Sequence, residues 1–181
     1  MSVSGAGAAG AWVIAFVAVV AVQRFFELGL SARHEARLRA MGAVEHSRGH
    51  FPIFIFLHTL FPLALLYEVL RLGAHPWATW PLWLALLLGA QGLRVSSMLA
   101  LGERWHVRIW VVPGMALVTS GPYRFLRHPA YVGVTLELLA APLLFGAWRT
   151  AIVVGALNAL ALFIRIRAEE RALRGSGAST A

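Results

Sequence analysis

Residues 77–100 of this chain read WATWPLWLALLLGAQGLRVSSMLA, with Arg94 as the one charged side chain. An α-helix rises about 1.5 Å per residue, so about 20 apolar residues cross the hydrocarbon core of a bilayer. The stretch is long enough and apolar enough to do this. It therefore predicts a membrane-spanning helix.

Four further stretches have the same character: residues 11–30, 51–70, 130–148 and 150–164. The whole chain is 59% hydrophobic and 13% charged, against roughly 45–50% and 25% in soluble domains. A soluble domain of 181 residues could not bury so much apolar surface. We therefore expect an all-α membrane protein with five transmembrane helices, forming a single domain over residues 1–174. Residues 175–181 are small and polar, and they predict a disordered tail.

The distribution of arginine predicts the orientation of these helices. The chain has 16 Arg and no Lys, against 8 Glu and no Asp, for a net charge of +8. Twelve arginines follow the first, third and fifth spans, namely Arg33, Arg37, Arg39, Arg48, Arg104, Arg108, Arg124, Arg127, Arg165, Arg167, Arg171 and Arg174, whereas only Arg71 and Arg149 follow the second and fourth. Because cytoplasmic loops carry the excess of basic residues, we expect the N-terminus outside and the C-terminus in the cytoplasm. Basic charge beside apolar spans favours membrane lipids, and no nucleic acid, as partners.

Several classes of site are excluded or disfavoured by composition. The chain has no cysteine, which excludes disulfides, thiolate metal sites and cysteine nucleophiles. Five histidines are scattered without the spacing of metal ligands, so we expect them at the interface and expect no metal: His34, His46, His50, His75 and His106. No glycine-rich Rossmann fingerprint occurs.

The segment between the third and fourth spans, residues 101–129, is too long to be a simple turn. Its residues 108–119 form two short extended runs around Pro113 and Gly114. Pro followed by Gly fits the centre of a type II turn, in which Gly takes the positive φ. We therefore expect a hairpin-like flap on the membrane face.

Two segments beyond this flap carry polar side chains next to apolar spans. Pro129 suits the first turn of a helix, whose unpaired N–H groups can seat a carboxylate between His128 and Tyr131. At the other segment, Arg165 and Glu169 are four residues apart and share a helix face. Taken separately, a basic juxtamembrane turn and a salt-bridged helix extension explain these segments without a ligand.

Taken together, the two segments match a known pattern. The run LVTSGPYRFLRHPAYVG (residues 117–133) is followed by Arg165-x-x-x-Glu169-Glu170-x-x-Leu173. This combination resembles the isoprenylcysteine carboxyl methyltransferase family, integral-membrane enzymes that use S-adenosylmethionine. The similarity covers most of residues 24–173 and is greatest to the small bacterial branch of the family.

The resemblance implies a cofactor site where the fourth span begins and the fifth ends. It assigns S-adenosylmethionine binding to the backbone of Met115, Ala116, Leu117 and Val118, to the side chain of Tyr123, and to His128, Pro129, Ala130, Tyr131 and Glu169. Arg165 resembles the catalytic arginine that orients the substrate in this family. Arg108 is a further candidate for substrate binding.

The acceptor is expected to be a lipophilic small molecule. The eukaryotic and archaeal members of the family continue past the Glu-Glu segment with a Tyr-containing cytoplasmic tail, whereas this chain continues with GSGASTA. The bacterial branch is associated with alkylpyrones, so the resemblance implies either an isoprenylcysteine-like carboxylate or an alkylpyrone-like acidic enol. Methyl transfer from a sulfonium is an in-line displacement that mainly requires alignment. The fork-shaped guanidinium of Arg165 suits an ionised acceptor oxygen.

Other functions remain open at this point. A phospholipid N-methyltransferase would share the cofactor elements but accept a neutral amine. A sterol-type reductase would need NADPH contacts that the sequence does not contain. A non-catalytic helical membrane subunit or a small transporter is a further alternative, although a transporter would more typically show an internal repeat.

Polar groups within the apolar spans are costly and therefore informative. We expect Arg94 and Glu137 to face the bundle interior and pair, and Arg24 to pair with Glu27 three residues away. The other such residues are expected at the interface (Glu68) or in interhelical hydrogen bonds (Gln91 and Asn158).

Overall fold

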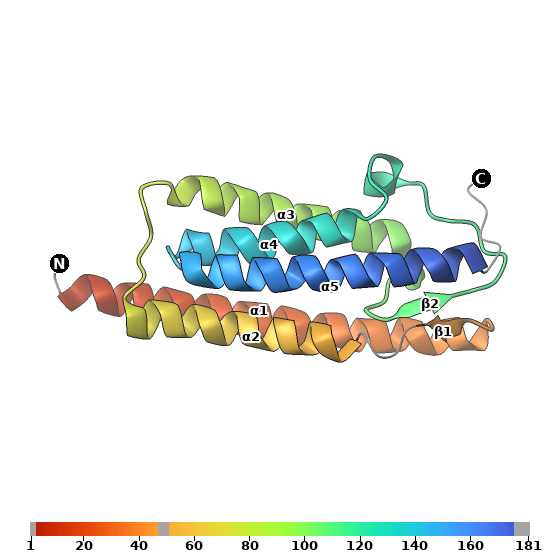
Figure 1. Cartoon of the computed structure of the whole chain (residues 1–181), viewed down its shortest axis with the longest axis horizontal. Helices are drawn as coiled ribbons and strands as arrows, with labels where there is room; N and C mark the ends of the chain where they lie inside the picture. Colours follow the sequence, from red (N-terminus) through yellow and green to blue (C-terminus); the bar gives the residue numbers. More distant parts are fainter. Residues whose placement is uncertain (1–2, 47–50, 176–181) are drawn as a thin grey trace.

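The computed structural model describes residues 3–46 and 51–175. Within them the chain forms five α-helices: α1 (Val3–Ala40), α2 (Phe51–Leu72), α3 (Trp80–Leu101), α4 (Pro129–Leu144) and α5 (Trp148–Gly175). The helices lie side by side along the length of the molecule, with α3, α4 and α5 in one layer and α1 and α2 in the other (Figure 1). The predicted all-α bundle is confirmed.

Four helices of the described chain are long and apolar enough to cross a membrane, namely α1, α2, α3 and α5. Helix α4 is apolar but has 16 residues, which extend about 24 Å. It ends before the predicted residue 148 because the chain turns directly into α5. In this turn Gly146 has a φ of +71°, and a Cβ on it would lie 2.0 Å from the carbonyl oxygen of His75. Only glycine fits there.

Two other helices are longer than the sequence predicts. Helix α1 continues ten residues past residue 30, to Ala40, because Ser31, Glu35 and Leu38 are buried on its inner face. Helix α5 continues through the expected charged extension to Gly175, one residue into the predicted tail. Residues 176–181 of that tail, together with Arg48 and His50, lie outside the described residues.

The hairpin expected within residues 108–119 is wrong. Strand β2 (Ile109–Val111) pairs antiparallel with β1 (Val44–His46) from the α1–α2 connection. Ile109 and Val111 are buried against α5, which fixes the inward face of β2. The expected turn does form, since Gly114 has a φ of +73° and the N–H of Met115 donates to the carbonyl of Val112 at 3.2 Å. It leads the chain away from β2 instead of back along it.

Four charged side chains meet inside the bundle and join α1, α3 and α4. Arg94 pairs with Glu137, and Arg24 lies 2.7 Å from Glu27, as expected. The pairs are also crossed, with Arg24 2.6 Å from Glu137 and Arg94 2.5 Å from Glu27. Each carboxylate thus contacts both guanidinium groups, and the cluster is neutral overall, as burial in a membrane requires.

Other polar residues of the spans also bond between helices. The amide of Gln91 on α3 accepts a hydrogen bond of 3.1 Å from Gln23 on α1, and Asn158 on α5 donates one of 3.1 Å to Thr135 on α4. Both predictions are confirmed. The interfacial position expected for Glu68 is wrong. Its carboxylate is buried and accepts the Thr150 N–H at 2.7 Å, so it caps the N-terminus of α5 from α2.

Candidate functional site

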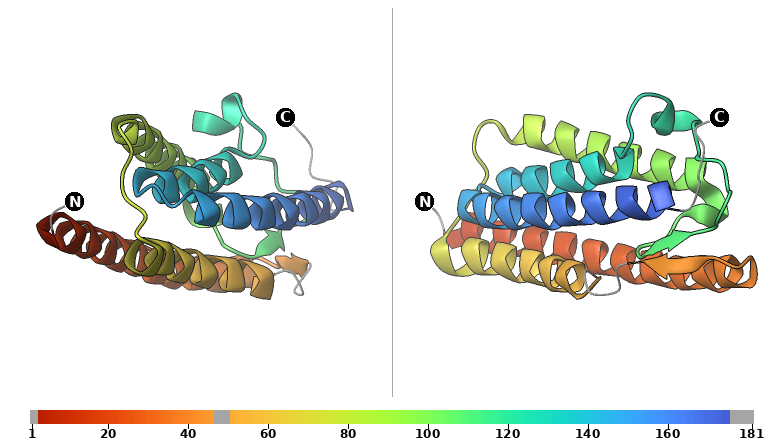
Figure 2. Two further views of the ribbon diagram at one scale, coloured as in Figure 1. Left: turned by 60° about the vertical axis from the view of Figure 1, so that its left-hand side comes forward. Right: turned by 45° about the vertical axis from the view of Figure 1, so that its right-hand side comes forward.

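One end of the bundle contains a cavity of about 590 Å³. Its walls come from the α3–α4 connection, which includes the short 3₁₀ helices η2 (Gly102–Arg104) and η3 (Gly121–Arg124), from the start of α4 and from the last turns of α5. Figure 2 shows from two sides that β1, β2, η3 and the end of α5 gather at this end, opposite the N-terminus. Segments far apart in the sequence therefore build one site.

The hydroxyl of Tyr131 lies at the centre of the polar groups. It accepts a hydrogen bond of 2.8 Å from Nε of Arg165 and donates one to Glu169. Tyr131 lies in the first turn of α4, whereas the other two residues are one turn apart on α5. The expected shared face of Arg165 and Glu169 is confirmed, and one hydroxyl connects the two helices across it.

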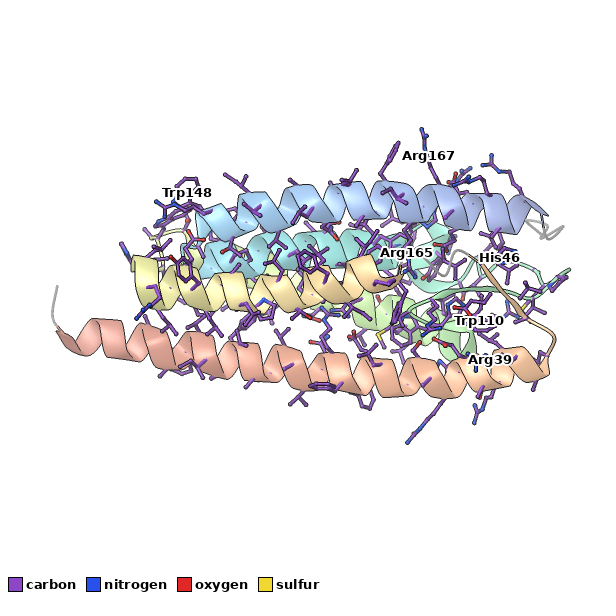
Figure 3. All side chains as sticks on the ribbon, turned by 60° about the horizontal axis from the view of Figure 1, so that its bottom comes forward. Arg39, His46, Trp110, Trp148, Arg165 and Arg167 are labelled. Carbon is purple, nitrogen blue, oxygen red and sulfur yellow. The ribbon has the colours of Figure 1, made fainter. Side chains whose placement is uncertain are left out.

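Arg165 is held on several sides. Its Nη2 donates to the carbonyl of Val107 at 2.6 Å, and its guanidinium carbon lies 5.0 Å from the centre of the Phe54 ring. Only 8% of the residue is exposed. In Figure 3 Arg165 lies within the bundle, whereas Arg167, two residues later, projects away from it. Within the described residues Nη1 of Arg165 has no hydrogen bond, so it remains able to bind another group.

His128 precedes the first turn of α4, which begins at Pro129 as expected. Its side chain does not cap the helix; the imidazole stacks on the Tyr131 ring, with centroids 5.3 Å apart and planes inclined by 14°. Its Nε2 lies 3.9 Å from a carboxylate oxygen of Glu170. The open N-terminus of α4 thus lies beside an aromatic stack at the cavity wall, where its N–H groups favour negative charge.

The structure brings most of the predicted site residues to this cavity. Those on its walls are Arg108, Met115, Ala116, Leu117, Val118, Tyr123, His128, Ala130, Tyr131, Arg165 and Glu169. Pro129 is the exception, because its side chain is fully buried behind the wall. The binding roles of these residues stay predictions.

Two residues on the walls have surroundings that limit what they can do. Burial, and then the nearby charge of Glu169, raises the pKa of Tyr123 to about 12, so its hydroxyl keeps its proton at neutral pH. Arg108 lies 3.1 Å from Glu45 of β1 and stacks over the Phe51 ring at 4.6 Å. Arg108 therefore ties the wall to the α1–α2 connection.

Sequence reasoning missed several wall residues, including Trp105, His106 and Trp110. The interfacial position expected for His106 is wrong: its imidazole lines the cavity, and burial lowers its pKa. Trp110 lies on β2 and is placed by the pairing of β2 with β1. Trp105 and His106 precede β2, in a segment held by the hydrogen bond from the Val107 N–H to Oγ of Ser31 on α1. The only available signal was their position in residues 101–129, the connection that is too long to be a simple turn.

Comparisons with known proteins agree with this geometry. A model of the isoprenylcysteine carboxyl methyltransferase (ICMT) family matches residues 83–175, which include most cavity residues. The chain is 39% identical over 158 residues to "Uncharacterized protein YpbQ" of Bacillus subtilis (strain 168), covering 87% of this chain and 94% of that protein. It is 30% identical over 161 residues to an "Uncharacterized protein" of Haemophilus influenzae, covering 88% and 93%. The chain is therefore an integral membrane protein that belongs to the isoprenylcysteine carboxyl methyltransferase family, a family of membrane methyltransferases.

Proposed function

We propose that this protein is an S-adenosylmethionine-dependent O-methyltransferase that acts on a lipophilic acceptor at the membrane. The observation that carries the proposal is the connection of Arg165 and Glu169 through the Tyr131 hydroxyl, on the wall of a cavity at one end of the bundle. It places a carboxylate and a guanidinium side by side in one site. The two charges suit a cationic donor and an anionic acceptor oxygen.

The cavity has the volume and the chemical groups that the donor requires. About 590 Å³ lies within the range of small-molecule sites, roughly 300–1,000 Å³. Carboxylates line it at Glu169 and Glu170, and guanidinium groups line it at Arg127 and Arg174. A molecule with an amine, a carboxylate and ribose hydroxyls can pair with these groups.

When bound, S-adenosylmethionine would supply a methyl group activated on a sulfonium sulfur. Met115 to Val118, Tyr123 and the His128–Tyr131 segment would bind it, with Glu169 completing the site from α5. The protonated Tyr123 hydroxyl is a hydrogen-bond donor here and not a base. Arg165 would orient the acceptor oxygen, since alignment is the main requirement of the reaction.

A lipophilic acceptor fits the surface next to Arg165. An apolar groove of about 110 Å³ runs between α2 and α5, with Ile53, Phe56, Leu160 and Ile164 among its lining residues. Ile164 directly precedes Arg165, and Phe54 of α2 packs on the Arg165 guanidinium. An alkyl or prenyl chain lying in this groove would present its polar end to Arg165.

An amine acceptor, as in phospholipid N-methylation, is disfavoured by the same guanidinium. Arg165 is permanently charged and buried, so a protonated amine beside it would be repelled and a neutral one would gain no charge-assisted bond. An anionic oxygen acceptor is both attracted and oriented by the guanidinium of Arg165.

We further propose that the cavity end faces the cytoplasm of a bacterial inner membrane. The arginines of the α3–α4 connection and of the end of α5 surround the cavity, and such charge is typical of cytoplasmic segments. Because the chain has no cysteine, single cysteines report the orientation cleanly. A membrane-impermeant maleimide added to intact spheroplasts should label Ala78→Cys but not Ser120→Cys; the reverse pattern would contradict this orientation.

The function is tested by methyl transfer with purified protein in detergent. Methyl-deuterated S-adenosylmethionine is incubated with a long-chain hydroxypyrone, a prenylated cysteine derivative and phosphatidylethanolamine, and the products are identified by mass spectrometry. We expect labelled methyl on oxygen of the pyrone or the prenylcysteine. Label on the phospholipid amine, or on none of the three, would contradict the proposal.

A further inference from the structure

His106 is one of the residues that line the cavity. Its Nδ1 is hydrogen-bonded to the carbonyl oxygen of Arg108. A carbonyl only accepts hydrogen bonds, so Nδ1 carries the hydrogen. Within residues 3–46 and 51–175, Nε2 has no hydrogen-bond partner.

The segment that carries His106 is held from two helices. The N–H of Val107 donates to Oγ of Ser31 on α1 at 2.9 Å, and the carbonyl of the same residue accepts from Nη2 of Arg165 on α5 at 2.6 Å. His106 is therefore held in place, and it directly precedes Val107, the residue whose carbonyl Arg165 contacts. His106 and Arg165 both line the cavity, and they lie close enough for the charge of Arg165 to act on the imidazole.

The surroundings of His106 favour the neutral imidazole. Burial lowers its pKa from the ordinary value of 6.5, and the positive charge of Arg165 acts in the same direction. The Arg108 carbonyl and the carboxylates of Glu169 and Glu35 oppose this without reversing it. At neutral pH the ring is thus neutral, and because Nδ1 holds the hydrogen, Nε2 presents a lone pair.

We propose that Nε2 of His106 accepts the proton of the acceptor during methyl transfer, which makes the acceptor a lipophilic hydroxyl compound that is still protonated at neutral pH. This rests on the function proposed above. The acceptor oxygen keeps the electron pair of its O–H bond and forms the bond to the transferred methyl group, while the pair of the methyl–sulfur bond stays on sulfur. The imidazolium that results loses its proton to solvent.

A carboxylate acceptor would not need this arrangement. It is already ionised at neutral pH, so Arg165 alone would bind and align it. A phenol or a weakly acidic enol is a poor nucleophile until its proton is removed, and a positioned base typically contributes about 100- to 10,000-fold. The acceptor class therefore decides whether His106 matters for turnover.

His106→Asn separates these cases, because the Asn amide can still donate to the Arg108 carbonyl but offers no lone pair in place of Nε2. The control is His75→Asn, an exposed histidine at the far end of the bundle whose Nδ1 also contacts a carbonyl two residues away. Wild type and both variants are assayed with a long-chain alkylphenol and with a long-chain fatty acid of matched length. Binding of S-adenosylhomocysteine is measured in parallel by calorimetry.

We expect all three proteins to bind S-adenosylhomocysteine equally, and His106→Asn alone to lose about 100-fold or more of its alkylphenol turnover. Wild-type turnover should decline in the acidic range, where Nε2 becomes protonated, and this decline should occur below the ordinary pH range of imidazole because burial lowers the pKa of His106. The proposal would be overturned if the wild type methylated the fatty acid but not the alkylphenol, or if His106→Asn kept the wild-type turnover of the alkylphenol. Failure of the wild type to bind S-adenosylhomocysteine would instead refute the proposed function.

A second measurement does not depend on the acceptor. Nitrogen NMR of histidine-labelled protein, with the His106 signals identified by their loss in His106→Asn, reports which ring nitrogen is protonated. We expect hydrogen on Nδ1 and a bare Nε2 at neutral pH. Hydrogen on Nε2, in the neutral or the charged ring, would overturn the proposal even if the variant were inactive.

Discussion

The hydroxyl of Tyr131 accepts a hydrogen bond of 2.8 Å from Nε of Arg165, across the interface of α4 and α5. The same hydroxyl donates to Glu169. In Tyr131→Phe both charged groups lose this partner, and a polar group left unpaired in a buried site costs about 1–3 kcal/mol. We expect S-adenosylhomocysteine to bind about tenfold more weakly by calorimetry. The control is Tyr67→Phe, a tyrosine 59% exposed on α2; equal affinities in the two variants would contradict the role of Tyr131.

Arg165→Lys should damage acceptor use and spare the donor. Lysine keeps the charge but lacks the planar fork that contacts Tyr131 and Val107 together. Misalignment of a reacting group can cost about 100-fold in rate, so we expect a loss of this size in methyl transfer with unchanged affinity for S-adenosylhomocysteine. Arg167→Lys on the outer face is the matched control. If Arg165→Lys loses donor affinity instead, its assignment to the acceptor is wrong.

Glu137→Gln should destabilise the bundle. The fully buried carboxylate of Glu137 contacts both Arg24 and Arg94, and its loss leaves a net positive charge inside the membrane-spanning region. Breaking a buried ion pair costs about 3–5 kcal/mol of folding free energy. We therefore expect a large drop in the midpoint of the unfolding transition measured in detergent. Glu103→Gln removes the ion pair between Arg37 and Glu103, whose side chains are 61% and 64% exposed. We expect this change to lower the free energy of unfolding by less than about 1 kcal/mol. Similar midpoints in the two variants would contradict the importance of the cluster.

Gly133→Ala tests the close approach of α4 to α3. A Cβ at Gly133 would lie 2.6 Å from Cγ of Arg94 and 3.1 Å from the carbonyl oxygen of Ala90, so we expect overpacking to destabilise by about 1–3 kcal/mol. Gly92→Ala on α3 has nothing within 4 Å of the new methyl and should be neutral or stabilising, because alanine favours helix. The same unfolding measurement distinguishes them, and a harmless Gly133→Ala would mean that the two helices can separate.

The sequence predicts the helices well because hydropathy over about 20 residues is a strong signal. It also predicts the interior pair of Arg94 and Glu137, since an unpaired charge in an apolar span is too costly. The convergence of His128, Tyr131 and Glu169 could be expected only from the family resemblance. No periodicity connects the start of one span with the end of another.

Other features could not be predicted because their signals are local and weak. Strands β1 and β2 have three residues each, too few for an alternating pattern to identify the partner, so the sequence predicts pairing of β2 within its own loop. Glu68 looks interfacial by its position in the sequence, and only the packing of α2 on α5 reveals that it caps α5. His106 enters the cavity for the same reason: a long-range contact positions it.

The central claim is that the cavity between the start of α4 and the end of α5 binds the methyl donor through Glu169. Calorimetry with S-adenosylhomocysteine tests it most directly, using wild-type protein and Glu169→Gln in the same detergent. We predict affinity of order micromolar for the wild type and binding at least about tenfold weaker for the variant, because Gln keeps the shape of the side chain but not its charge. No binding by the wild type, or equal binding by both proteins, would contradict the claim.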